Sequence, residues 1–299
     1  MNRIDAIFNH LREQGQKALM PFLTAGDPDM ATTARLVEAV AQVGCPICEL
    51  GFAFSDPIAD GPVIQESMAR ALAAGASATA TFDMVEQVRP RVDIGIVAMV
   101  SYSIVHRWGV DRFVHRAREV GVDGFIFPDM AIEQTDAIRQ RVADEGLIAS
   151  FLIAPTTPLE RARRIARASS GFIYLVSRSG VTGEQATLPP ELPDRIAALR
   201  QETDLPIAVG FGIATAAQVA EVVSVADAAI VGSSIVRRVA GSACAGEGAD
   251  AVVRAVADYT AELAAPTRQQ RNQVGGTGTV RAGSAEARPV EGRERAADG

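Results

Sequence analysis

In Cys48-Glu49-Leu50-Gly51-Phe52-Ala53-Phe54-Ser55-Asp56-Pro57-Ile58-Ala59-Asp60-Gly61-Pro62, a short apolar run meets a polar loop. The run over residues 46–50 is typical of a buried strand, and Gly51 ends it. Glu49 lies inside this strand, where a charged group is costly unless it is paired or solvated by a cleft. Asp56 and Asp60 follow in the loop. Because acids in such places commonly carry out chemistry, we expect the active site here.

Similar apolar runs recur along the chain and alternate with segments of helical period. The expected strands are residues 18–23, 46–50, 94–100, 124–127, 148–153, 172–176, 207–209 and 228–231. The expected helices are residues 30–43, 63–74, 110–119, 132–144, 158–168, 190–202 and 214–223. Strands that are apolar throughout and alternate with helices indicate a parallel sheet covered on both faces. Eight such units predict an α/β fold of the (β/α)8 TIM-barrel type.

The ends of the chain extend this barrel. Residues 3–14 have the pattern of an extra helix, which we expect across the bottom of the barrel. Residues 1–265 then form a single catalytic domain. Residues 266–299 contain no Leu, Ile, Met or aromatic residue, so we expect a disordered tail. No G-x-G-x-x-G motif follows the first strand, which argues against a dinucleotide-binding fold.

The composition excludes several classes of protein. A net charge of −7 over 299 residues argues against nucleic-acid binding, which usually needs a basic face. No apolar run approaches the roughly 20 residues of a membrane span, and the N-terminus lacks the apolar stretch of a signal peptide. Three cysteines do not form a disulfide framework. We therefore expect a cytoplasmic protein.

Lysine is almost absent from the chain. Lys17 is the single lysine, and it precedes the first strand, so it should lie at the bottom of the barrel. A Schiff-base mechanism at the top of the strands is therefore disfavoured. The three histidines are not placed to share a metal there, so we expect no metal site. Cys45 and Cys48 have C-x-x-C spacing, but the second lies within a strand, which disfavours a redox pair.

Glycine-rich turns follow several strands. Gly210-Phe211-Gly212-Ile213 and Gly232-Ser233-Ser234 follow the seventh and eighth strands. Backbone N–H groups at such turns, with the start of a short helix, form the usual phosphate site of these barrels. Ser177-Arg178-Ser179-Gly180-Val181-Thr182-Gly183 follows the sixth strand and is suited to a lid. Acids, a lid and a phosphate site together predict a phosphorylated carbon skeleton as the substrate.

These motifs resemble those of the tryptophan synthase α subunit family. The resemblance rests on the Glu49–Pro62 stretch, on Pro21-Phe22-Leu23-Thr24-Ala25-Gly26-Asp27-Pro28, on residues 177–183 and on residues 210–213. They fall in matching order over roughly residues 1–263. The resemblance implies a lyase of tryptophan biosynthesis that cleaves indole-3-glycerol phosphate to indole and glyceraldehyde 3-phosphate by a retro-aldol reaction.

The resemblance also implies roles for individual residues. Glu49 would be the principal acid–base group, and Asp60 would hold the indole N–H. The apolar slot would be Phe22, Ile64 and Met99, with Tyr174 near the acids. Phosphate would be bound by Gly183, Phe211, Gly212, Gly232 and Ser233, and Thr182 would close the lid against the Asp60 loop.

The same resemblance implies a partner. Asp56, Pro57 and Ser103 would face a β subunit, in a heterotetramer of two α and two β subunits. This subunit would need no cofactor, and pyridoxal phosphate would belong to the β subunit. Ala53, Ser103 and Ala131 stand where the family commonly has Pro, Asn and Pro, on the surface expected to face that partner.

Two other interpretations stay open at this point. The chain could be another phosphate-binding barrel enzyme acting on a sugar phosphate, with the same anion site but no need for an indole slot. It could also be a non-catalytic barrel that only activates a partner. A pure scaffold has no need of a buried acid, so the behaviour of Glu49 separates these interpretations.

Overall fold

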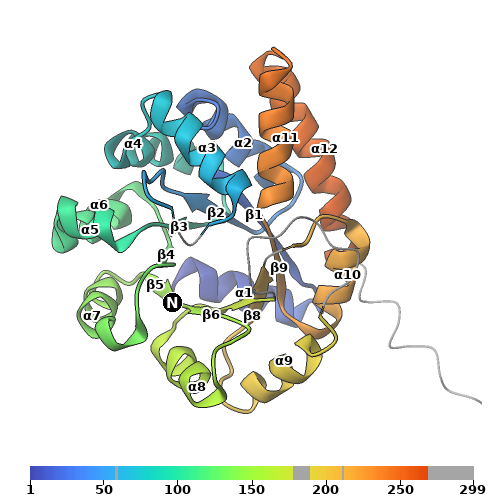
Figure 1. Ribbon diagram of the computed structural model, residues 1–299. Coiled ribbons are helices and arrows are strands. Elements are labelled where there is room, and N and C mark those ends of the chain that lie inside the picture. Colours follow the sequence, from blue (N-terminus) through green and yellow to red (C-terminus); the bar gives the residue numbers. More distant parts are fainter. Residues whose placement is uncertain (58–59, 178–188, 211, 269–299) are drawn as a thin grey trace, which may run out of the picture.

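The computed structural model describes residues 1–57, 60–177, 189–210 and 212–268. Its strands are β1 (Ala18–Thr24), β2 (Ile47–Gly51), β3 (Gly95–Met99), β4 (Gly124–Ile126), β5 (Ile148–Ser150), β6 (Leu152–Ile153), β7 (Ile173–Val176), β8 (Ile207–Gly210) and β9 (Ala228–Val231). All are parallel, in the order β5-β4-β3-β2-β1-β9-β8-β7-β6. The strands form the centre of a barrel that helices surround (Figure 1).

The helices follow the strands around the barrel. They are α1 (Arg3–Glu13), α2 (Met30–Gln42), α3 (Pro62–Ala73), α4 (Ala78–Val88), α5 (Tyr102–Trp108), α6 (Val110–Val120), α7 (Asp136–Asp144), α8 (Leu159–Ala168), α9 (Leu192–Arg200), α10 (Ala216–Val225), α11 (Ser233–Cys244) and α12 (Ala249–Arg268). Two 3-10 turns, η1 (Arg89–Arg91) and η2 (Ile132–Gln134), complete the described elements. The predicted (β/α)8 barrel with an N-terminal helix is confirmed.

The strand predicted over residues 148–153 is divided into two short strands, β5 and β6. β5 pairs with β4, β6 pairs with β7, and only Phe151 separates β5 from β6. The Phe151 N–H donates to the Ser169 hydroxyl at 3.2 Å, and the Ala149 N–H donates to the Ser170 hydroxyl at 2.9 Å. The two serine hydroxyls accept hydrogen bonds from backbone N–H groups that would otherwise pair with a neighbouring strand. The expected strand over residues 148–153 is therefore interrupted in its middle.

The barrel separates two apolar cores. Along β2, Ile47 packs in the interior with Met20, Val97 and other strand residues, whereas Leu50 packs outside against the helices. This alternation follows from the period of two in a strand. Helix α1 covers one end of the interior with Ile4 and Phe8 (Figure 1). The barrel is thus a packed core, and space for a substrate has to lie at the other end.

Three parts of the structure differ from the sequence prediction. Helices α4 and α5 were not predicted, and neither were α11 and α12, which pack against β1. The predicted start of the tail, Pro266, is too early in the sequence, because α12 continues to Arg268. The Lys17 N–H donates to the Thr267 carbonyl at 3.1 Å, which anchors the last turn of α12 to the start of β1. Residues 269–299 lie outside the described part.

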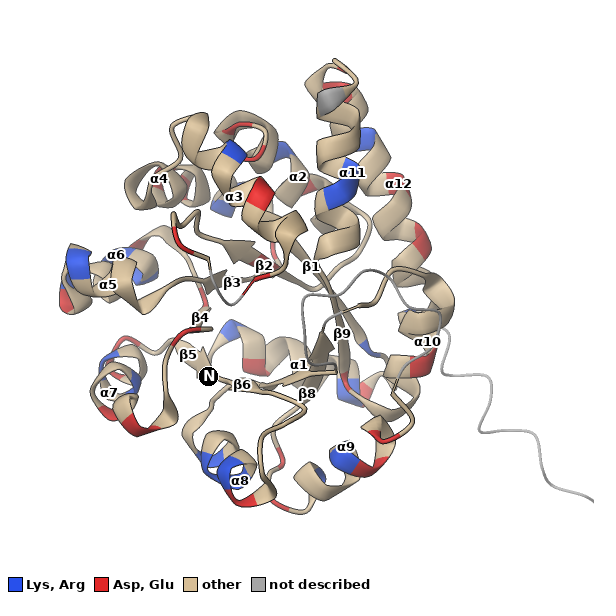
Figure 2. Cartoon of the chain, in the orientation of Figure 1, with Lys and Arg blue, Asp and Glu red and all other residues tan. Residues whose placement is uncertain are grey.

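Charged residues are distributed over the outer helices. Basic and acidic segments alternate around the ring rather than forming a face of one sign (Figure 2). Many are paired, as in the Arg161–Glu133 and Arg116–Glu86 ion pairs, both at 2.7 Å. Among the described residues, no helix is long and apolar enough to cross a membrane.

Candidate active site

Glu49 is the buried acid that the sequence pointed to, and its side chain faces the barrel interior. It stands in register with Phe22 of β1 and Val97 of β3. The residue is 0% exposed, and neither carboxyl oxygen has a hydrogen-bond partner among the described residues. Burial, and then the charge of Asp60, raise the pKa of Glu49 to about 8. Such a group is mostly protonated at neutral pH and can donate a proton.

Two aromatic side chains lie beside Glu49 because glycines make room for them. A Cβ at Gly51 would lie 2.4 Å from the Phe22 ring, and one at Gly210 would lie 2.7 Å from the Tyr174 hydroxyl oxygen. The pKa of Tyr174 is raised by burial, and then by the charges of Glu49 and Asp60. The phenol therefore stays protonated, within electrostatic reach of both acids.

Asp60 borders a cavity of about 240 Å³ at the carboxyl ends of β2, β3 and β4. The pKa of Asp60 is raised to about 6, first by burial and then by the charge of Asp129. The cavity is lined by Phe52, Phe54, Asp56, Pro57, Asp60, Met68, Met99, Val100, Ser101, Ser103, Pro128 and Asp129. The expected partner-facing residues are thus at the wall of this cavity, and Asp56 and Ser103 are exposed there.

The residues expected to form an apolar slot do come together. Phe22, Ile64, Met99 and Tyr174 belong to one buried interior cluster, and all are less than a tenth exposed. Met68 joins them, although sequence reasoning missed it. Its position four residues after Ile64 on a helix was the available signal, because residues so spaced share a face.

Two cavity residues that sequence reasoning left out form a linked pair. Asp129 accepts a hydrogen bond from the Ser101 hydroxyl at 2.6 Å and from the Tyr102 N–H at 3.0 Å. These contacts fix the start of α5, the helix that carries Ser103. The available signal was the place of Asp129 directly after a buried strand, which the sequence alone could not separate from a solvated loop charge.

The expected phosphate site is described only in part, because Thr182, Gly183 and Phe211 lie outside the described residues. Gly212 has a φ of +82°, a conformation that favours glycine. Gly232 caps α11 without a side chain, and Ser233 begins that helix. The Ser234 hydroxyl donates to the Ile213 carbonyl at 3.3 Å, which holds the β8 loop against the start of α11. Backbone N–H groups at such a helix start suit an anion.

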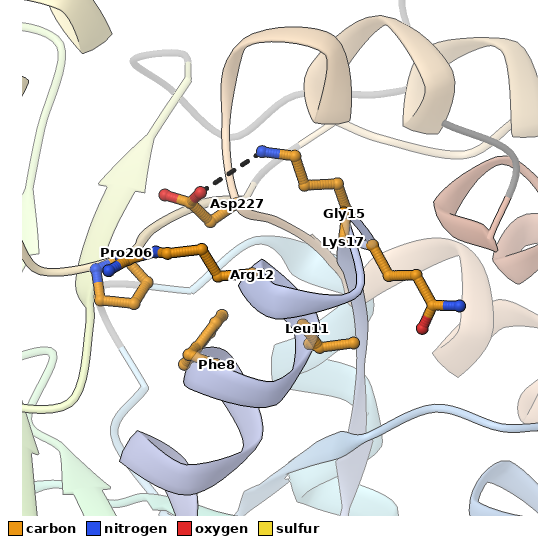
Figure 3. Close-up of a pocket in the computed structure, with 8 residues that line it drawn as sticks. Phe8, Leu11, Arg12, Gly15, Lys17, Pro206 and Asp227 are labelled. Carbon is orange, nitrogen blue, oxygen red and sulfur yellow. Dashed lines mark hydrogen bonds and ion pairs between the residues drawn. The ribbon is translucent and has the colours of Figure 1, made fainter. Parts of the chain in front are cut away.

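Lys17 lies at the opposite end of the barrel, as expected. It pairs with Asp227 at 3.3 Å in a pocket of about 150 Å³ that α1 borders with Phe8 and Leu11 (Figure 3). Lys17 and Asp227 directly precede β1 and β9, so both belong to the amino ends of the strands. The one lysine is therefore remote from Glu49 and does not serve the candidate site.

The cysteine pair has the properties of buried core thiols. Cys45 and Cys48 are at most 1% exposed, and both are free. Burial raises the pKa of Cys45 to about 12 and also raises that of Cys48. Thiols held in the protonated form are poor nucleophiles, so the C-x-x-C spacing here is structural. Within the described residues, no group of three His, Cys, Asp or Glu side chains could hold a metal ion.

Comparison with known proteins gives one family. The family model described as tryptophan synthase alpha chain matches residues 8–267. The tryptophan synthase alpha chain of Rhodopirellula baltica is 44% identical over 243 residues, covering 80% of this chain and 87% of that protein. That of Synechococcus sp. is 42% identical, covering 82% and 91%.

Solved structures give the same result. A tryptophan synthase subunit alpha from Legionella pneumophila superposes with a TM-score of 0.82 at 31% identity, covering 89% of this chain and 98% of that one. A chain of the M. tuberculosis tryptophan synthase in its aminoacrylate-bound form superposes with a TM-score of 0.78 at 28% identity, covering 90% and 100%. The likeness thus spans the whole barrel.

Proposed function

Since this chain belongs to the tryptophan synthase alpha chain family, we propose that it cleaves indole-3-glycerol phosphate to indole and glyceraldehyde 3-phosphate. It is a lyase of tryptophan biosynthesis. One observation carries the residue assignment. The Glu49 carboxyl group is fully buried at the carboxyl end of the barrel and has no hydrogen-bond partner among the described residues. A buried acid left unpaired in this way needs a functional explanation.

Glu49 would transfer protons in both halves of the reaction. Its protonated carboxyl group gives a proton to C3 of the indole ring, which turns the ring into an iminium-like electron acceptor. The resulting carboxylate then takes the proton of the adjacent glycerol hydroxyl, and the carbon–carbon bond breaks toward the ring. Indole and an aldehyde leave, and Glu49 is protonated again, so no external acid or base is consumed.

Asp60 would act in the opposite protonation state. As a carboxylate it accepts a hydrogen bond from the indole N–H and stabilises the positive charge that protonation at C3 creates. With pKa values of about 6 for Asp60 and about 8 for Glu49, ionised Asp60 and protonated Glu49 coexist mainly between these values. Two acids whose environments separate their pKa values divide the roles of acid and base in this way.

The rest of the site would bind the substrate. Phe22, Ile64 and Met99, with Met68, would surround the apolar indole ring, and Tyr174 is within electrostatic reach of Glu49 and Asp60. Gly212, Gly232 and Ser233 would bind the phosphate through backbone N–H groups, together with Gly183 and Phe211. Thr182 would close its loop over Asp60. Water excluded from the closed site cannot compete for the reacting proton.

The cavity wall suggests where a partner would dock. Asp56, Pro57 and Ser103 would contact the tryptophan synthase β subunit, in an assembly of two α and two β subunits. We place pyridoxal phosphate in the β subunit, because the reaction proposed for this chain takes its electron acceptor from the substrate. A cytoplasmic location fits this pathway.

Indole release from indole-3-glycerol phosphate tests the proposal. Purified full-length protein should release indole slowly by itself and faster when a β subunit is added. Absence of release even with the partner would contradict the substrate assignment. A screen of other sugar phosphates would then test the wider class of phosphate-binding barrels.

A further inference from the structure

Helix α3 is joined directly to the loop that carries Asp60. The helix begins at Pro62, two residues after Asp60. The Gln65 side-chain amide donates hydrogen bonds to the Asp60 carbonyl at 2.8 Å and to the Pro57 carbonyl at 3.2 Å. One side chain of α3 therefore holds the loop backbone on both sides of residues 58–59.

The other contacts of α3 fix it to the end of β1. Arg70 donates from Nε and Nη2 to the two carboxyl oxygens of Asp27, at 3.0 and 2.8 Å. The hydroxyl groups of Thr24 and Ser67 share a hydrogen bond of 2.7 Å. Asp27 is only 3% exposed, and both of its carboxyl oxygens are bound by this one guanidinium group. The helix is thus held at two successive turns against the loop that follows β1.

We propose that α3 positions Asp60 at the carboxyl end of the barrel, and that Gln65 and Arg70 are the positioning residues of this helix. Gln65 sets the loop relative to the helix, and Arg70 sets the helix relative to β1. Neither residue is among those that line the cavity, so neither is assigned contact with a substrate. The importance of Asp60 in this inference rests on the function proposed above.

The two residues should differ in the size of their effects. Gln65 is exposed and makes neutral hydrogen bonds, which are worth little net stability. Arg70 neutralises a buried carboxylate, and loss of one partner of such a pair is strongly destabilising. Loss of Gln65 should therefore free the loop on an intact barrel, whereas loss of Arg70 should displace the helix together with Ile64 and Met68.

The titration of Asp60 reports its position without depending on the reaction. Asp60 interacts electrostatically with Glu49, Tyr174 and Asp129, and burial is the largest cause of its raised pKa. A loop released from α3 exposes the carboxyl group to water, so its pKa should fall from about 6 toward the ordinary value of 3.8. Carbon-13 NMR of labelled aspartate in the full-length protein measures this, with Asp60→Asn assigning the signal.

The experiment compares Gln65→Leu, Arg70→Gln and Arg70→Lys with the matched controls Glu66→Gln, on the same helix, and Arg91→Gln, which breaks the surface pair with Glu38. Gln65→Leu should lower the Asp60 pKa and reduce kcat about threefold to tenfold, with the unfolding midpoint little changed. Arg70→Gln should reduce kcat/KM about 10- to 100-fold, and Arg70→Lys should recover part of that loss.

The outcomes distinguish the positioning role of α3 from the proposed lyase activity. An unchanged Asp60 titration and kcat in Gln65→Leu, measured on folded protein, would overturn the proposal whatever happens to Arg70→Gln. If Gln65→Leu lowers the Asp60 pKa but the wild-type protein releases no indole, the positioning role of α3 is supported and the lyase assignment is contradicted. Loss of kcat in the two controls as well would overturn the specific roles of Gln65 and Arg70.

Discussion

Replacement of Glu49 by Gln is expected to lower kcat for indole release by about 10²- to 10⁴-fold, with little change in KM. The amide keeps the size of the side chain but neither gives nor takes the reacting proton. Glu49 is 0% exposed, so bulk water does not reach the carboxyl group to take over the proton transfer. Steady-state indole release with the β subunit present measures the effect.

Glu66→Gln supplies the matched control, because Glu66 is an exposed acid on α3 and the substitution makes the same change from a carboxyl group to an amide. That variant should keep the wild-type rate within about twofold, as surface substitutions usually do. A Glu49→Gln enzyme with more than a tenth of the wild-type kcat would show that another group moves the proton.

The same substitution is expected to change how stability depends on pH. Glu49 has a pKa of about 8 in the folded chain, against an ordinary value of 4.5, so the folded state holds a proton that the unfolded state loses. The free energy of unfolding should therefore fall as pH rises from about 4.5 to about 8, by roughly 4–5 kcal/mol from this group. Glu49→Gln should remove that fall.

Urea denaturation at pH 5, 7 and 8.5 tests this, with the difference between variant and wild type as the quantity compared. A buried amide without partners costs about 1–3 kcal/mol at every pH, so only the pH dependence is diagnostic. Asp60→Asn should keep most of the effect, because burial is the larger cause of the raised pKa. Parallel stability curves for wild type and Glu49→Gln would contradict it.

The sequence predicted the barrel because its strands are apolar throughout and recur between helices. The place of Glu49 followed from the same pattern, since a strand with one acid near its carboxyl end puts that acid at the mouth of a barrel. Lys17 at the amino end followed from its position before β1. These are local signals, and each depends on a few neighbouring residues.

Features that depend on distant contacts were missed. The interruption at Phe151 is set by the hydroxyl groups of Ser169 and Ser170, which lie a helix away in the chain. The end of α12 extends past Pro266 because its last turn contacts the start of β1. The role of α3 could not be predicted from the sequence, since its partners Thr24 and Asp27, at the end of β1 and in the loop after it, lie some forty residues earlier.

A direct titration of the Glu49 carboxyl group is the measurement that bears most on the function proposed here. Infrared difference spectroscopy, with Glu49→Gln to assign the signal, should show the C=O stretch of a protonated carboxyl group at pH 7, lost with a midpoint near pH 8. An ionised Glu49 at pH 6, with a midpoint near 4.5, would contradict its role as the proton donor.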